Sequence, residues 1–143
     1  MDSAPKYVGK ARYPVAERYV CDQEQWHEIR VSIRPGRERV IQVVGDIDML
    51  TAPALDGAIT DNLAAWPRVL ILDLSGVTFL ASTGLATLMS ASEDCRAAGA
   101  ALRLVGTQQC VLRPMELTGL IGQFDVYPDI ESALRGEVTR PQR

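Results

Sequence analysis

Lysine is nearly absent from this chain of 143 residues, since both of its lysines, Lys6 and Lys10, lie within the first ten positions. A P-loop needs a lysine directly after its glycine-rich turn, and the one glycine-lysine pair lies in the N-terminal tail. Walker-type nucleotide hydrolysis is therefore excluded. A phospho-receiver site also requires an active-site lysine, which argues against that chemistry at Asp73, the residue at the end of a predicted strand.

Histidine is scarce as well, and the cysteines form no recognisable pair. A nucleophilic relay at Ser82 would need His27, the sole histidine, and the residues around Ser82 do not form a G-x-S-x-G elbow. The three cysteines, Cys21, Cys95 and Cys110, are odd in number and show no C-x-x-C spacing. These absences argue against hydrolase activity, a disulfide framework and a zinc site. We expect reduced thiols.

Long apolar runs and basic clusters are also missing. No window approaches the about 18 uninterrupted apolar residues of a membrane-spanning helix, and the N-terminus has no apolar signal region. The formal net charge is -3, with acids and bases interspersed, which argues against nucleic acid or an anionic membrane as a partner. The composition, 47% hydrophobic, therefore predicts one cytoplasmic domain without a metal or cofactor.

The hydrophobic pattern divides the chain into a domain of residues 25–136, a polar N-terminal tail or loosely docked arm, 1–24, and a polar C-terminal tail, 137–143. Apolar alternation and apolar runs predict strands at 26–34, 39–44, 69–74, 101–105 and 124–127. Helical spacing predicts a helix that Thr51 or Asp48 caps and that ends by Trp66, and three further helices at 82–98, 108–117 and 130–134. This order of elements is typical of an α/β fold.

The segment 69–85 is the most informative part of the sequence. A buried strand at 69–74 runs into turn-forming residues at 73–76, and a helix follows with Ser82 placed to act as its N-cap. The hydroxyl of Ser82 is therefore expected at the carboxyl edge of the sheet, where ligands and partners of open α/β sheets are usually bound. A phosphate there would be tolerated by the fold, because the helix dipole and free N–H groups favour an anion.

Four short motifs in order give the chain a family resemblance. They are Gly45-Asp46-Ile47-Asp48 with Thr51-Ala52, the segment 73–79 followed by Ser82-Thr83-Gly84-Leu85, Ala98-Gly99-Ala100, and Leu117-Thr118-Gly119-Leu120. Together they resemble the anti-sigma factor antagonists, the single-domain bacterial form of the STAS domain, over residues 28–134. The resemblance implies a STAS-type α/β domain, with a four- to five-stranded mixed sheet and about four helices packed mainly on one face.

The resemblance also implies a function without catalysis. An unmodified antagonist of this family binds an anti-sigma factor, which is an ATP-dependent serine kinase, and so frees the sigma factor for transcription. Phosphorylation by that kinase releases the antagonist, and a PP2C-like phosphatase resets it. The implied function is partner switching in transcription regulation, as in a stress response.

The phosphoacceptor of the family falls on Ser82, with Thr83 as the second candidate, and its signature carboxylate falls on Asp48. Asp46, Asp48, Thr51, Ser82, Thr83 and Gly84 are expected to bind the partner, Gly84 because a residue without a side chain permits close approach of a partner backbone. A well-known member has aspartate before the acceptor serine and serine after it, whereas this chain has Ala81 and Thr83.

Two alternatives keep some of these features and change the function. One is a STAS scaffold that is not phosphorylated, or a module that senses thiol oxidation through Cys95 or Cys110. The other is a small phosphotransfer protein that uses Asp73 as an acyl-phosphate acceptor.

Overall fold

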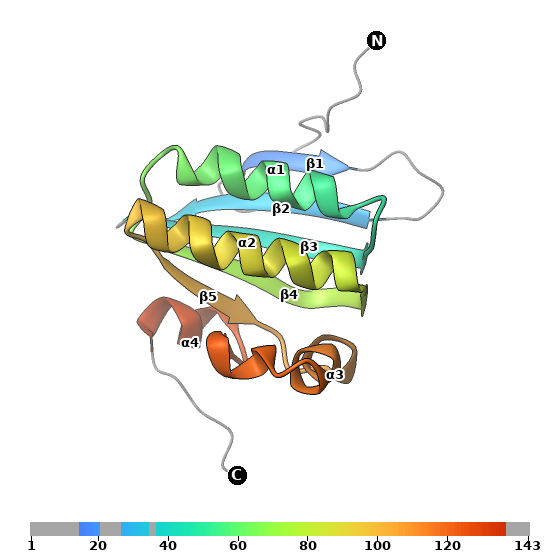
Figure 1. Cartoon of the computed structure of the whole chain (residues 1–143). Helices are drawn as coiled ribbons and strands as arrows, with labels where there is room; N and C mark the ends of the chain where they lie inside the picture. The colour runs from blue at the N-terminus through green and yellow to red at the C-terminus, as the bar shows by residue number, and fades with distance from the viewer. Residues whose placement is uncertain (1–14, 21–26, 35–36, 137–143) are drawn as a thin grey trace.

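The computed structural model describes residues 15–20, 27–34 and 37–136 of the chain. Their strands form one six-stranded mixed sheet in the order β1-β2-β3-β4-β5-β6 (Figure 1). The first three strands pair antiparallel, and β3 to β6 pair parallel. The elements are β1 Val15–Val20, β2 His27–Arg34, β3 Glu38–Ile47, α1 Ala52–Leu63, β4 Val69–Leu80, α2 Ser82–Ala98, β5 Ala101–Val105, α3 Gln109–Leu117, the 3-10 helix η1 Leu120–Gln123, β6 Asp125–Tyr127 and α4 Ile130–Arg135.

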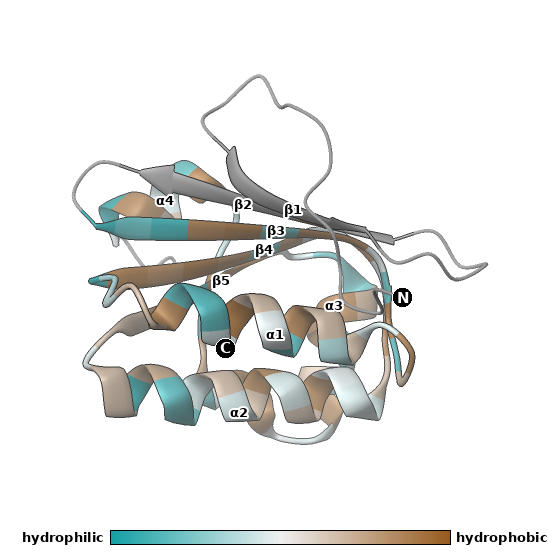
Figure 2. Cartoon of the chain, turned by 90° about the horizontal axis from the view of Figure 1, so that it is seen from above, coloured by the Kyte–Doolittle hydropathy of each residue, from teal (hydrophilic) through white to brown (hydrophobic). Residues whose placement is uncertain are grey.

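Helices cover the two faces of the sheet unequally. The helices α1 and α2 lie side by side on one face, and α4 lies on the other (Figure 2). The main core, which includes Leu55, Leu72, Leu88 and Met115, joins the sheet to α1, α2 and α3. A smaller cluster around Tyr127 joins the sheet to α4. The predicted α/β class, with helices mainly on one face, is therefore confirmed.

The predicted caps of two helices are confirmed. Gly99 ends α2 in the left-handed conformation, with φ of 75°. The carboxylate of Asp129 accepts a hydrogen bond from the backbone N–H of Ser132 at 2.7 Å, and this bond lowers the pKa of Asp129. Both caps satisfy backbone groups that the end of a helix leaves without partners.

The N-terminal boundary of the fold was predicted wrongly. Residues 15–20, which the sequence assigned to a polar tail or loosely docked arm outside the domain, form β1, which pairs antiparallel with β2 from Val15 to Val20. A strand at the edge of a sheet is held by backbone hydrogen bonds on one side and tolerates polar residues, so hydrophobic periodicity does not reveal it. The sheet consequently has six strands in place of the four or five that were expected.

The turn predicted at residues 73–76 lies inside a strand. β4 continues to Leu80 because it pairs with β3 along its whole length, from Glu38↔Val69 to Ile47↔Leu80. The turn-forming residues instead lie at a register shift between β3 and β4. Glycine suits position 76 there, because a Cβ would lie only 3.0 Å from the side chain of Val44.

Asp73 is consequently a residue of the strand interior. Its side chain is buried, and its carboxylate accepts hydrogen bonds from the backbone N–H and the hydroxyl of Ser75 and from the side-chain amide of Gln42. An acyl-phosphate acceptor needs an exposed carboxylate at the end of its strand. The position of Asp73 therefore removes the basis for the phosphotransfer alternative.

The last part of β4 extends beyond its neighbour β5, whose pairing ends at Asp73↔Val105. The side chain of Gln108 takes the place of a neighbouring strand. Its amide nitrogen lies 2.8 Å from the carbonyl oxygen of Leu74, 3.2 Å from that of Ser75 and 3.0 Å from that of Val77. One side chain thus satisfies carbonyl groups that would otherwise lack partners in this stretch.

We predict that Gln108→Ala lowers the free energy of unfolding by about 1 to 3 kcal/mol, because partly buried carbonyl groups of β4 lose their donor. Gln109→Ala is the matched control, since Gln109 is exposed and directly follows Gln108. Urea unfolding of the two variants measures the difference. Equal stability of both variants would show that water replaces the side chain without loss.

Candidate functional site

A backbone hydrogen bond joins the two segments in which the sequence places its candidate residues. The N–H of Ala81 donates to the carbonyl of Ile47 at 2.9 Å, directly after the last pair of the β3–β4 ladder. This bond places the loop between β3 and α1 beside the start of α2. We call residues 46–51 and 78–84 together the carboxyl edge.

Ser82 is the first residue of α2 and is exposed. The sequence predicted that it is the N-cap of this helix, and that prediction is wrong. The N-cap is Ala81, whose extended backbone offers its carbonyl to the N–H of Leu85 at 3.0 Å. The reason is the length of β4, which reaches Leu80 and leaves one residue between strand and helix. Because Ser82 is exposed and lies after the N-cap residue, a group added to its hydroxyl does not replace a helix cap.

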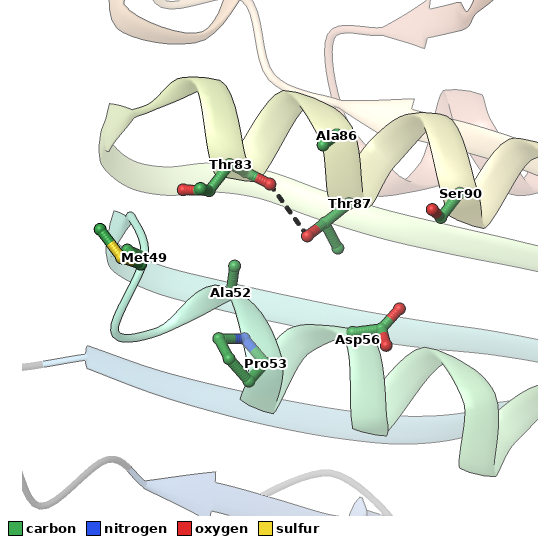
Figure 3. A pocket seen from close by; sticks show the side chains of 8 residues that line it. All are labelled: Met49, Ala52, Pro53, Asp56, Thr83, Ala86, Thr87 and Ser90. Carbon is green, nitrogen blue, oxygen red and sulfur yellow. Dashed lines mark hydrogen bonds between the residues drawn. The ribbon is translucent and has the colours of Figure 1, made fainter.

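Thr83 directs its hydroxyl into the protein. The oxygen is buried and has no hydrogen-bond partner among the described residues. It borders a hollow of about 390 Å³ between α1 and α2 (Figure 3), lined by Met49, Ala52, Pro53, Asp56, Thr83, Ala86, Thr87 and Ser90. A kinase needs an accessible hydroxyl, so this geometry favours Ser82 over Thr83 as the acceptor.

Thr51 is buried and holds the loop before α1 in shape. Its hydroxyl donates to the carbonyl of Asp46 at 2.7 Å and accepts from the N–H of Asp48 at 2.9 Å. Thr51 occupies the N-cap position of α1, but its side chain makes no capping bond. The residue therefore shapes the edge from inside and offers no surface to a partner, in contrast to its predicted role.

The two carboxylates of the loop are engaged within the chain. One oxygen of Asp48 accepts the N–H groups of Leu50 and Thr51, at 3.0 and 3.2 Å. One oxygen of Asp46 accepts the hydroxyl of Thr78 at 2.6 Å, which links the end of β3 to β4. Both side chains remain partly exposed and contribute negative charge to the carboxyl edge.

Large apolar side chains stand exposed at this edge, and the sequence reading did not identify them. Met49 is 74% exposed, Leu50 60% and Phe79 52%. Met49 and Leu50 lie at the tip of the loop that Asp48 and Thr51 fix, whereas Phe79 lies opposite Asp46 in the β3–β4 register. The sequence does contain a signal for this apolar surface, which is the pair Met49-Leu50 directly after Gly45-Asp46-Ile47-Asp48. A turn does not itself require apolar residues, so their presence there needs another explanation.

Gly84 faces the interior and not a partner. A Cβ at this position would lie 2.6 Å from a methyl group of Leu80 and 2.8 Å from one of Ile47. The close approach for which glycine is required is therefore made by the chain's own strands. Packing inside the domain thus accounts for glycine at this position without a partner backbone.

Comparison with known proteins agrees with this fold. The STAS domain family model matches residues 28–133. The chain belongs to the STAS domain family. The anti-sigma-F factor antagonist RsfB of Mycobacterium tuberculosis is 36% identical over 99 residues, which cover 68% of this chain and 79% of RsfB. The crystal structure of an anti-sigma factor antagonist from Mycobacterium paratuberculosis is 37% identical and superposes with a TM-score of 0.71, covering 77% of this chain and 92% of that one.

A more distant neighbour shares the fold of this STAS domain. The anti-sigma factor antagonist SpoIIAA of Bacillus in its unphosphorylated form is 16% identical, with a TM-score of 0.64 over 78% of this chain and 99% of SpoIIAA. Its phosphorylated form gives a TM-score of 0.60. The named relatives are regulatory binding proteins and not enzymes, as the sequence predicted.

The carboxyl edge of the STAS domain contains few cations. Residues 40–67 and 69–95 contain no lysine or arginine, and these segments include both loops of the edge and the first three turns of α2. The first turn of α2 also contains no acidic residue, so no carboxylate of that turn offsets the partial positive charge of the helix N-terminus. The negative charge of this edge therefore comes from Asp46 and Asp48, and the segments that form the edge contain no arginine.

The cysteines of the STAS domain do not form a reactive site. Burial, with a smaller effect of Asp94, raises the pKa of the Cys95 thiol to about 11, so the reactive thiolate is disfavoured. The thiol of Cys110 lies 3.2 Å from the carbonyl oxygen of Val77. Both are free thiols, and Cys21 lies outside the described residues. Within the described part of the chain no cluster of ligands for a metal is found, and no helix is long and apolar enough to cross a membrane.

We predict that Gly84→Ala lowers the free energy of unfolding by about 1 to 3 kcal/mol, because the added methyl group overlaps Leu80 and Ile47. Gly57→Ala is the matched control. It lies inside α1 with open space around it, and its replacement is expected to stabilise the domain by about 0.5 to 1 kcal/mol. Thermal unfolding measures both, and equal shifts would contradict the assigned packing of Gly84.

Proposed function

We propose that this STAS domain is an anti-sigma factor antagonist that binds an anti-sigma factor through its carboxyl edge while Ser82 is unmodified. Phosphorylation of Ser82 then releases it, and sigma-factor-dependent transcription is regulated by this exchange of partners. The observation that carries the proposal is that Ser82 is exposed at the first position of α2, beside three exposed apolar side chains. The names of the relatives support the choice of partner.

The surface around Ser82 suits a protein partner. Met49, Leu50 and Phe79 offer apolar area that the domain itself does not bury. Such area, rimmed by polar groups, is typical of interaction surfaces. The loop that carries Met49 and Leu50 is fixed by Asp48 and Thr51, so little conformational entropy is lost when a partner binds.

A phosphate on Ser82 would change this surface without disturbing the fold. It adds about -1.5 to -2 charges to an edge that already carries Asp46 and Asp48. The free N–H groups at the start of α2 stabilise an anion there, so the domain accepts the modification. Because the neighbouring segments contain no cation to neutralise it, the charge faces the partner and weakens binding. SpoIIAA, which shares the fold, is known in a phosphorylated form.

The anti-sigma factor in this proposal is an ATP-dependent serine kinase that modifies Ser82, and a PP2C-like phosphatase removes the phosphate in the cytoplasm. Ala81 distinguishes this chain, since no carboxylate precedes the acceptor. A carboxylate in that place would orient the serine hydroxyl or accept its proton, so phosphorylation is expected to be slow. A carboxylate in that place would also add negative charge to the surface before phosphorylation. Because Ala81 has none, the phosphate changes the local charge by a larger fraction.

The scaffold alternative differs in one prediction, which is that the state of Ser82 does not matter for binding. Its thiol-sensing form has little support, because the thiol of Cys95 is buried and its pKa is raised. The two readings are therefore separated by substitution of Ser82.

We predict that the wild-type protein and Ser82→Ala bind the anti-sigma factor alike, whereas Ser82→Asp binds at least tenfold more weakly. Thr60→Asp is the matched control, because it adds the same charge at an exposed position of α1. A pull-down from native lysate identifies the anti-sigma factor by mass spectrometry, and titration with the purified partner gives the affinities. Equal affinity of wild type and Ser82→Asp would support the scaffold reading.

The acceptor itself is tested by incubation of the purified partner with ATP. We predict that Thr83→Val is phosphorylated like the wild type, because the Thr83 hydroxyl is enclosed and makes no hydrogen bond that valine would lose. Ser82→Ala is expected to take up no phosphate. Phosphopeptide mass spectrometry locates the site, and phosphate on Thr83 would contradict the assignment.

A further inference from the structure

A second surface lies at the end of the sheet opposite Ser82, where β3 and β4 begin. It consists of residues 37–39 and 66–68, which we call the arginine edge. The carbonyl of Arg37 accepts the N–H of Arg68 at 2.8 Å, the guanidinium of Arg37 donates to the carbonyl of Trp66, and Arg68 pairs with Glu38 at 2.6 Å. These contacts hold two loops that are distant in sequence as one unit.

Trp66 has two features that the stability of the fold does not explain. The residue is 64% exposed, so the fold leaves a large aromatic side chain mostly accessible to solvent. Its φ of 57° is in the left-handed region, where glycine is the usual residue, and Arg37 with φ of 67° is the one other non-glycine residue of this kind in the described chain. Asparagine or glycine would fit this turn with less strain. Strained residues that are retained in this way are often functional.

The charge of the arginine edge specifies what it would bind. Residues 37–39 and 66–68 contain three arginines and one carboxylate, that of Glu38, so their net charge is +2. Glu38 pairs with Arg68, whereas Arg39 donates to the side chain of Asn62. The side chain of Arg68 remains 60% exposed even though it pairs with Glu38, and Arg37 is exposed too. Exposed arginines beside an exposed tryptophan combine donors for carboxylates with a rigid apolar anchor, the residue types enriched in the energetic centres of interfaces.

We propose that the arginine edge docks an acidic segment of a partner protein, whose carboxylates bind Arg37 and Arg68 and whose apolar side chain packs on Trp66. The edge carries the charge opposite to that of the carboxyl edge, so the two surfaces select different partners. Binding at one end leaves the other end of β3 and β4 accessible. The STAS domain thereby connects the protein bound near Ser82 to a second protein.

The test uses the full chain and a fluorescein-labelled peptide of twelve residues in which Glu and Leu alternate. The same peptide with Gln in place of Glu is the control, and anisotropy gives the affinity. We expect saturable binding of the acidic peptide that Trp66→Asn weakens at least tenfold while the thermal midpoint stays the same or rises. Arg68→Gln should also weaken binding, whereas Leu117→Asn, at an exposed apolar residue elsewhere, should not.

Several results would overturn the proposal. They are absence of saturable binding, equal binding of the Gln peptide, and wild-type affinity of Trp66→Asn. Concentration-dependent sedimentation that Trp66→Asn abolishes would show a second copy as the occupant, and binding of a single-stranded oligonucleotide in place of the peptide would show a nucleic acid. Ser82→Asp is expected to bind the peptide like the wild type, so failure of this test is distinguishable from failure of the proposed switch.

Discussion

The parallel pairing of β3 with β4 is the constraint on which the rest of the structure depends. It runs from Glu38↔Val69 to Ile47↔Leu80 and is completed by the hydrogen bond from Ala81 to Ile47. Because the ladder continues, across two register shifts, to Leu80, α2 begins at Ser82 with a plain alanine as its cap. The same ladder brings the loop of residues 48–51 beside that helix start. The length of β4, which is set by its pairing with β3, therefore places Ser82 at an exposed position that does not cap the helix.

The interior of the domain supports this arrangement from both sides of β4. Gly84 allows α2 to approach the ends of β3 and β4, where a methyl group would overlap Ile47 and Leu80. On the other side, Gln108 supplies donors to the carbonyl groups that β5 is too short to reach. The position of Ser82 is therefore fixed by the packing at Gly84 and the hydrogen bonds of Gln108, and not by contacts of Ser82 itself. A group added to its hydroxyl changes the surface and leaves these contacts in place, as a binding switch requires.

The sequence predicted the elements of the core well, because apolar residues at strand and helix spacing report burial directly. It failed where backbone pairing decides the outcome. The strand 15–20 has no clear apolar period, and residues 73–76 have turn chemistry but lie in a strand because β3 pairs with them. The same error moved the helix cap to Ser82. The candidate site was located from motifs, but the inward roles of Thr51 and Gly84 depend on contacts between distant segments, which no local pattern contains.

The two edges are far enough apart to act independently. β4 has 12 residues, and at about 3.3 Å per residue it separates Ser82 from Trp66 by roughly 35 to 40 Å. Interactions between exposed charges are screened over about 8 Å at physiological salt, so a phosphate on Ser82 has almost no electrostatic effect on Arg37 or Arg68. A partner at the arginine edge would therefore stay bound through both states of the switch. The charge separation along the sheet, with arginines at one end and carboxylates at the other, suits a domain that releases one protein while it retains another.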